Sequence, residues 1–153
     1  MNARLNANLA APDAVAAVVA LDKYVHGSGL ELSLLELVKT RASQINGCAY
    51  CIHMHTRDAR ARGESEERLH MLGVWRESTL YTARERAALG WAESLTEVSR
   101  SHAPDEVYDE AQRHFSQDEL VKLTVAIGLI NVWNRIAIGF RYAHPAAKRP
   151  VST

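Results

Sequence analysis

Two cysteines and a histidine recur at helical spacing in the segment 47–55, which reads Gly-Cys-Ala-Tyr-Cys-Ile-His-Met-His. On an α-helix with roughly 100° per residue, Cys51 lies about 60° from Cys48, and His55 lies about 20° from Cys48 on the other side. The three side chains therefore share one stripe, whereas His53, at about 140°, faces elsewhere. Free backbone N–H groups and the macrodipole of a first helical turn favour a thiolate. The stripe predicts a reactive dithiol, with His55 close enough to Cys51 to act as its base or as its imidazolium partner.

Helix geometry also places Glu36 near this stripe. Glu36 stands 11 residues before Gly47, and His55 stands 8 residues after it. If the chain turns at Gly47 into an αα-hairpin, the two residues lie about 16 Å and about 12 Å along their helices, level to within one turn. The Glu36 carboxylate can then orient His55, directly or through a water, and accept its proton. A second interpretation stays open, because Glu36 is also the third helical residue of a capping box that begins at Ser33.

Zinc binding is the main alternative use of a cysteine pair. The sequence has no second CxxC and His53 leaves the stripe, so a closed four-ligand zinc site needs a distant residue such as His26, His70 or His114. We expect no metal ion and no bound cofactor, and we expect the two thiols themselves to be the redox group. A zinc-stabilised or thiol-sensing module without turnover is the alternative from outside the enzymes.

The elements that must position these residues follow a helical period throughout the chain. Capping boxes at Thr82–Glu85 and Ser116–Glu119 and a turn at Asn46-Gly47 mark helix ends clearly. Together with the apolar spacing, such signals predict helices over 13–26, 33–45, 48–62, 65–77, 82–95, 104–114 and 116–142. No segment predicts a strand. The sequence therefore predicts an all-α fold, with the CxxC at the start of a helix in an αα-hairpin.

The segment 121–140 is apolar on more than one face. Such a helix is buried, either at the centre of the domain or against a partner subunit, and both interpretations stay open. The second would make the protein a homo-oligomer. Three polar residues interrupt the apolar surface, namely Asn131, Asn134 and Arg135. They could line a pocket or satisfy buried helix ends, and we interpret them as structural.

Length and composition exclude several classes of function. The chain has 153 residues, 18 basic and 18 acidic side chains and two cysteines, which predicts one domain over 1–153. A net charge of zero argues against nucleic-acid binding through a basic face. No apolar run approaches the roughly 20 residues that cross a bilayer, and residues 1–10 do not resemble a signal peptide. We therefore expect a cytoplasmic protein with neither nucleic acid nor a membrane as its partner.

At these spacings, Glu36, Cys48, Cys51 and His55 resemble the core motif of the AhpD-like alkylhydroperoxidases, a CxxC-containing branch of the carboxymuconolactone decarboxylase superfamily. The stretches 75–78, 84–89 and 131–135 agree with this resemblance, which covers about residues 10–145, the core of the predicted domain. The resemblance implies an all-α fold, assembly into trimers or hexamers, and thiol-dependent reduction of alkyl hydroperoxides.

The resemblance also implies a role for each site residue. Cys51 would be the attacking thiolate beside His55, Cys48 the resolving thiol, and Glu36 the far end of a proton relay, and the cysteines would end the cycle as a disulfide. The residues alone leave the attacking cysteine open, because Cys48 lies closer to the helix start. A lipoyl-domain or thioredoxin-type protein is the implied reductant.

The sequence departs from the best-known AhpD proteins in two respects. It is one short domain, and Tyr50 replaces the histidine found between their cysteines. A lactone or decarboxylase activity, with incidental cysteines, is the alternative within the superfamily. The decarboxylase branch lacks the cysteine pair, so the presence of Cys48 and Cys51 argues against this alternative.

Overall fold

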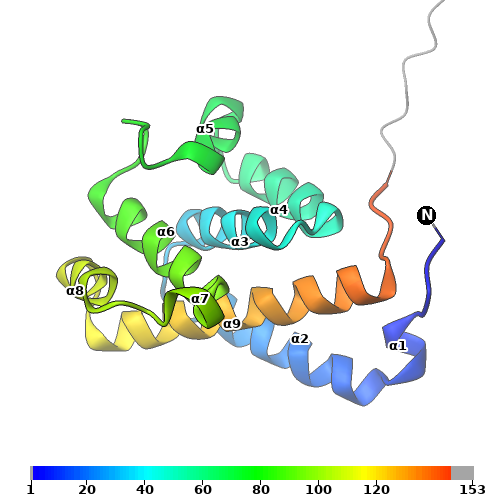
Figure 1. The fold of residues 1–153 in the computed structure, drawn as a ribbon. Helices are drawn as coiled ribbons and strands as arrows, with labels where there is room; N and C mark the ends of the chain where they lie inside the picture. The colour runs from blue at the N-terminus through cyan, green and yellow to red at the C-terminus, as the bar shows by residue number, and fades with distance from the viewer. Residues whose placement is uncertain (1, 146–153) are drawn as a thin grey trace, which may run out of the picture.

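The computed structural model describes residues 2–145, and within that range the chain forms helices and no β-strand (Figure 1). The helices are α1 (Ala7–Ala10), α2 (Pro12–His26), α3 (Leu32–Asn46), α4 (Ala49–Ala61), α5 (Glu66–Met71), the 3₁₀ turn η1 (Leu72–Val74), α6 (Ala83–Thr96), α7 (Val98–Ser101), α8 (Asp105–His114) and α9 (Gln117–Phe140). The predicted all-α fold is confirmed. The short helices α1 and α7 were not expected from the sequence.

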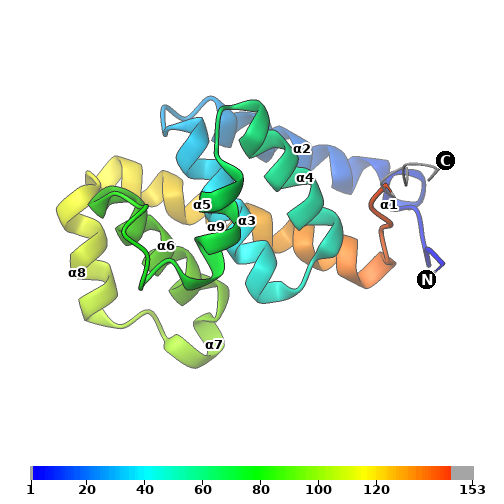
Figure 2. The same ribbon diagram turned by 90° about the horizontal axis from the view of Figure 1, so that it is seen from above.

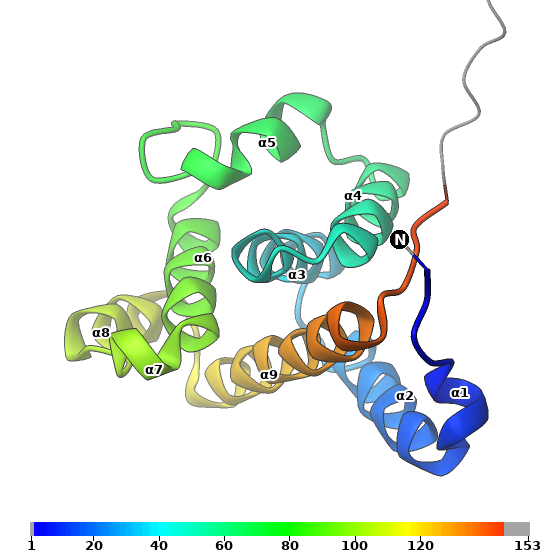
Figure 3. The same ribbon diagram turned by 45° about the vertical axis from the view of Figure 1, so that its right-hand side comes forward.

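Helix α3 lies at the centre of the fold. It contacts α4, α6 and α9, which surround it in Figures 2 and 3. Its apolar residues Leu35, Leu37 and Val38 are completely buried. Burying each such side chain stabilises the fold by roughly 1.5–3 kcal/mol, so the packing of α3 fixes where its polar residues point.

The turn between α3 and α4 forms the predicted αα-hairpin. Gly47 adopts a left-handed backbone conformation, with φ of 70°, at the C-cap of α3. The Gly47 N–H donates to the Gln44 carbonyl, and the Cys48 N–H donates to the Ser43 carbonyl at 2.9 Å. These bonds satisfy the last carbonyls of α3 and start α4 without a loop. A residue with a Cβ atom at position 47 would be strained by the positive φ.

Two of the three predicted capping boxes are confirmed. The Thr82 and Ser116 side chains each accept a hydrogen bond from the backbone of the glutamate three residues later, and each glutamate bonds back. The box at Ser33 is wrong, because α3 begins at Leu32 with Glu31 as its N-cap and no side-chain cap. Glu36 is therefore the fifth residue of α3, too deep in the helix to bond its N-terminal N–H groups.

Two other helix ends differ from the prediction. The predicted helix 65–77 is α-helical only to Met71 and continues as the 3₁₀ turn η1, after which Trp75 is buried against α6 and donates from Nε1 to Glu93 at 2.8 Å. The predicted helix 116–142 ends at Phe140, because Arg141 takes a left-handed conformation, with φ of 58°, as its C-cap. In both cases local backbone geometry ends the helix before the apolar pattern does.

By length and composition alone, α9 is a helix that could cross a membrane, contrary to the sequence prediction that no such run exists. The central helix of a helical protein passes the same test. Here α9 packs against α2, α3 and α6, with Leu123, Ile127 and Ile130 buried. The apolar surface of α9 thus contributes to the core.

Candidate active site

Glu36 and His55 meet inside the αα-hairpin, as the helix geometry predicted. The His55 Nδ1 atom lies 2.8 Å from Oε2 of Glu36, and the two residues are only 5% and 2% exposed. Donation from Nδ1–H to the carboxylate leaves Nε2 as the working nitrogen of the ring. That Nε2 atom is buried and has no hydrogen-bond partner among residues 2–145. The pair thus presents an imidazole nitrogen that is free to exchange a proton with a ligand or a thiol.

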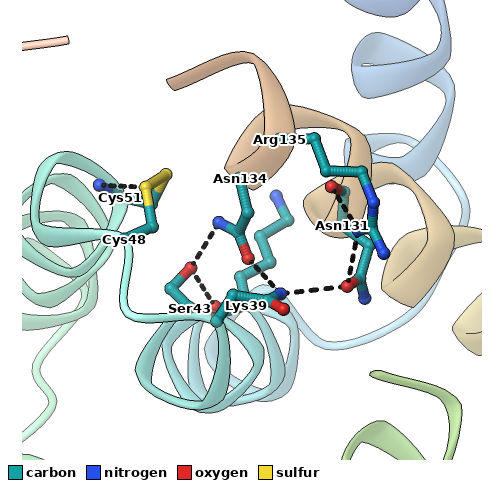
Figure 4. Close-up of a disulfide and its surroundings, with 8 residues drawn as sticks. Lys39, Ser43, Cys48, Cys51, Asn131, Asn134 and Arg135 are labelled. Carbon is teal, nitrogen blue, oxygen red and sulfur yellow. Dashed lines mark hydrogen bonds between the residues drawn. A yellow bond between two sulfur atoms is a disulfide. The ribbon is translucent and has the colours of Figure 1, made fainter. Parts of the chain in front are cut away.

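Cys48 and Cys51 form a disulfide at the start of α4 (Figure 4). Cys48 is the N-cap of the helix, not its first residue as predicted, and its Sγ accepts a hydrogen bond from the Cys51 N–H at 3.3 Å. Both cysteines are buried, with Ala137 of α9 against them. A helix N-terminus stabilises negative charge on sulfur, so this position suits a disulfide that is opened to a thiolate.

A cavity of about 430 Å³ adjoins the disulfide and the Glu36–His55 pair. Cys51, His55 and Glu36 line it, whereas Cys48 does not. Its walls are otherwise largely apolar, with side chains from α2, α4 and α9 that include Val15, Val19, Leu129, Ile130 and Trp133. The volume suits a small organic molecule, and such a molecule would meet Cys51 rather than Cys48.

The sequence analysis did not identify a second polar group that lines this cavity. Lys39 lines the cavity and is only 2% exposed, and its Nζ lies 3.5 Å from Nε2 of His26 on α2. One feature of the sequence could have identified Lys39: it stands three residues after Glu36, so both side chains lie on one face of α3. The approach of α2, which brings His26 to Lys39, was not encoded in any local pattern.

The asparagines of α9 are structural, as interpreted from the sequence (Figure 4). The fully buried Asn134 donates from Nδ2 to Oγ of Ser43 at 3.0 Å and accepts from Nδ2 of Asn46 at 2.8 Å. Asn46 also donates to Oδ1 of Asn131, and that oxygen accepts from Arg135 as well. This network ties α9 to the last turn of α3, directly before the cysteines.

Of the three histidines named for a zinc site, only His26 lines the cavity with Cys51, and its Nε2 lies beside Nζ of Lys39. The His70 side chain is 79% exposed, and His114 pairs with Glu110 on its own helix. His53 lies outside the Glu36–His55 pair, as predicted, and stacks on His144. Across residues 2–145, no three histidine, cysteine or acidic side chains are grouped as metal ligands.

Comparisons with known proteins agree with this fold. A family model described as the carboxymuconolactone decarboxylase family matches residues 12–94. The uncharacterized protein YdfG of Bacillus subtilis is 39% identical over 138 residues, which cover 90% of this chain and 94% of YdfG. A crystal structure of a protein of unknown function from Agrobacterium tumefaciens, with a suggested role as the antioxidant defence protein AhpD, is 49% identical with a TM-score of 0.93 and covers 95% of this chain and 100% of that one.

A peroxidase-related protein from Silicibacter shares the fold at lower identity. It is 24% identical, with a TM-score of 0.76 over 85% of this chain and 69% of that one. The protein has the AhpD-like fold and belongs to the carboxymuconolactone decarboxylase family.

Proposed function

We propose that this protein is a thiol-dependent peroxidase that reduces organic hydroperoxides through Cys48 and Cys51. One observation carries the proposal, namely that the buried Glu36–His55 pair lines the same cavity as Cys51. A nucleophile, a base and a residue that orients the base are the parts that activated-nucleophile chemistry needs. The suggested antioxidant role of the Agrobacterium relative supports the same activity.

The reaction starts from the reduced dithiol. His55 takes the Cys51 proton through Nε2, and Glu36 stabilises the imidazolium through Nδ1. The Cys51 thiolate attacks the terminal peroxide oxygen, the O–O bond breaks, and the alkoxide leaves as an alcohol with the proton from His55. Cys51 becomes a sulfenic acid, oxidised by two electrons. The Cys48 thiol then attacks the Cys51 sulfur, water leaves, and the disulfide forms.

A dithiol must return two electrons and two protons to the disulfide. We propose a lipoyl-domain or thioredoxin-type protein as this reductant, since each carries a dithiol that can exchange with the Cys48–Cys51 bond. We further propose that the chain acts as one domain within a cytoplasmic homo-oligomer, a trimer or a hexamer.

The alternative activities predict different behaviour of the cysteines. A lactone or decarboxylase activity would survive the double change Cys48→Ser/Cys51→Ser, because its chemistry would not use the thiols. A zinc or thiol-sensing module would hold stoichiometric zinc after purification, with the thiols blocked until a chelator is added. The peroxidase proposal predicts neither result.

The experiment mixes each reduced single variant with one equivalent of cumene hydroperoxide and measures the alcohol formed. Cys48→Ser should form one equivalent of alcohol and stop as a sulfenic acid, which gains the mass of one oxygen atom. Cys51→Ser should form none. The reverse pattern would reassign the attack to Cys48, and a lack of alcohol in the wild-type protein would overturn the proposal.

A further inference from the structure

Lys39 is a buried cation that the proposed reaction does not use. Its side chain is 2% exposed and lines the same cavity as Cys51 and His55. Lysine is almost never fully buried unless a partner compensates its charge, so its presence at this position calls for a functional explanation.

Within the described residues, the ammonium group of Lys39 has fewer hydrogen-bond partners than it has N–H donors. An ammonium group has three N–H donors. Among residues 2–145 its only hydrogen bond is a long one, 3.5 Å, to Nε2 of His26. The nearest carboxylate oxygen, Oδ1 of Asp22, is 3.9 Å away, on a side chain that is 35% exposed. A buried charge that is incompletely hydrogen-bonded is costly, and a ligand that supplies acceptor oxygens would remove that cost.

The three acidic residues that line the cavity each have a cationic or histidine partner. Glu36 bonds to His55, and Asp58 pairs with Arg57 at 2.8 Å. Asp22 is shared, with carboxylate oxygens 3.4 Å from Nδ1 of His26 and 3.9 Å from Nζ of Lys39. Lys39 therefore has one distant carboxylate partner and two N–H groups without an acceptor among residues 2–145, and the complementary ligand group is one with charged acceptor oxygens, such as a carboxylate.

The cavity has a reactive end and a cationic end. Glu36 and Lys39 lie about 4.5 Å apart along the axis of α3, and they pair with histidines from different walls, His55 on α4 and His26 on α2. Apolar side chains of α2 and α9, such as Val19 and Ile130, line the space beside them. This layout fits an apolar molecule with one reactive group and one separate anionic group.

We propose that Lys39 binds a carboxylate of the substrate, so that the preferred hydroperoxides are those that carry a carboxylate on an apolar body. The carboxylate accepts two hydrogen bonds from Nζ, while the half-exposed Asp22 turns toward solvent. The peroxide group then points to Cys51. This inference rests on the proposed peroxidase function for the reacting group, but the anion site itself does not depend on redox activity.

A binding experiment tests the anion site on the oxidised protein, which cannot react. Calorimetry compares octanoate with octan-1-ol, which has the same chain and no charge. Wild-type protein should bind octanoate at least roughly tenfold more tightly, and Lys39→Gln should lose that preference. Lys23→Gln, which removes the same charge from an exposed position on α2, should keep it. Equal binding of the two probes by wild-type protein, or an unchanged preference in Lys39→Gln, would overturn the proposal.

Two further measurements keep the test independent of protein folding and of the proposed function. If Lys39→Gln does not fold, as judged by its helical circular dichroism, Lys39→Arg should fold and still favour octanoate, because the cation remains. Loss of the preference in a folded Lys39→Arg protein, with the wild-type preference intact, would contradict binding through the charge.

The kinetic arm compares a carboxylate-bearing hydroperoxide with its methyl ester. Wild-type protein should show a kcat/KM ratio of roughly ten or more in favour of the acid, and Lys39→Gln should bring the ratio close to one. Reduction of both at equal rates would overturn the substrate preference and leave the peroxidase function standing. Reduction of neither, with octanoate still bound, would overturn the peroxidase function and leave the anion site standing.

Discussion

At the scale of single residues, the hydrogen bond between Glu36 and His55 determines what the site can do. Its length of 2.8 Å and the burial of both partners fix the imidazole, whose Nε2 has no hydrogen-bond partner among residues 2–145. In the proposed reaction, a carboxylate at Nδ1 holds the ring in one tautomer and stabilises the imidazolium ion that forms during proton transfer. The charge of Glu36, and not only its shape, should therefore affect the rate.

We predict that Glu36→Gln slows oxidation of the dithiol by a factor of about 10². Glutamine keeps the size of the side chain and one acceptor oxygen, but it cannot stabilise an imidazolium ion. The measurement is the rate of thiol loss in a single turnover with cumene hydroperoxide. Glu67→Gln, an exposed change on α5, serves as the matched control and should react at the wild-type rate. A Glu36→Gln protein as fast as this control would remove Glu36 from the relay.

The sequence predicted the positions of Cys48, Cys51, His55 and Glu36 because helix periodicity and one glycine turn determine them. Their distances follow from repeats of about 1.5 Å per residue. Lys39 and His26 could not be paired in this way, since they meet only through the tertiary placement of α2, which packs on α9. The capping box at Ser33 also failed, because the N-cap of α3 is Glu31, two residues earlier than the polar pattern suggests.

At the scale of the elements, α9 holds the end of α3 in place through Asn134. This side chain is fully buried and satisfies both Ser43 and Asn46. The Ser43 carbonyl in turn accepts the Cys48 N–H, so the amide network continues into the cysteine turn. Polar residues in an apolar helix are explained here by the helix end that they satisfy.

We predict that Asn134→Leu lowers the free energy of unfolding by about 2–3 kcal/mol. Leucine has a similar size, but it removes one of the two acceptors of the Asn46 amide and the donor to Ser43. Urea denaturation measures the change. Asn2→Leu, at an exposed position, should leave the urea midpoint where it is. An unchanged midpoint in Asn134→Leu would show that the network does not stabilise the junction.

Glu93 on α6 joins three segments in the same way. Its carboxylate accepts hydrogen bonds from Arg41 of α3, from Trp75 after η1, and from Arg76. Burial acts to raise the pKa of Glu93, but the hydrogen bonds from Arg76, Trp75 and Arg41 outweigh it and hold the pKa below its ordinary value. A lowered folded-state pKa stabilises the protein above the unfolded-state pKa, and this contribution is lost as the pH falls through the folded-state pKa.

We predict that Glu93→Gln lowers the free energy of unfolding by about 1–2 kcal/mol at neutral pH. The difference from wild type should shrink as the pH falls into the acidic range where Glu93 itself becomes protonated. Urea denaturation at a series of pH values measures this trend, with Glu67→Gln as a carboxylate change outside the cluster. A difference that stays constant down to the acid range would contradict the ionised role of Glu93.

At the scale of the whole molecule, the helical order was predictable because caps and apolar spacing are local signals. The boxes at Thr82 and Ser116 located the starts of α6 and α9 correctly. The 3₁₀ turn after Met71 was not predictable, since it depends on where Trp75 packs against α6. The apolar surface of α9 likewise has two explanations in sequence, a core or a partner, and its packing on α3 supplies the first.

Several large apolar side chains of α2 and α9 remain exposed, including Val19, Tyr24, Val121 and Val132. Exposed apolar surface of this kind is typical of subunit contacts. We predict that sedimentation equilibrium gives a mass of three or six times the chain mass of 17.0 kDa. A species at the mass of one chain across the concentration range would contradict the proposed oligomer.

In the proposed function, Cys48 and Cys51 act as one two-electron redox unit toward hydroperoxides. The most direct measurement reduces the protein, removes the reductant, adds one equivalent of cumene hydroperoxide, and follows free thiols and intact mass together. We predict that both thiols disappear together, with the loss of two hydrogen atoms from the protein mass, and that Cys51→Ser abolishes this reaction. Thiols that stay reduced in the wild-type protein, or that react only after a metal ion is removed, would contradict it.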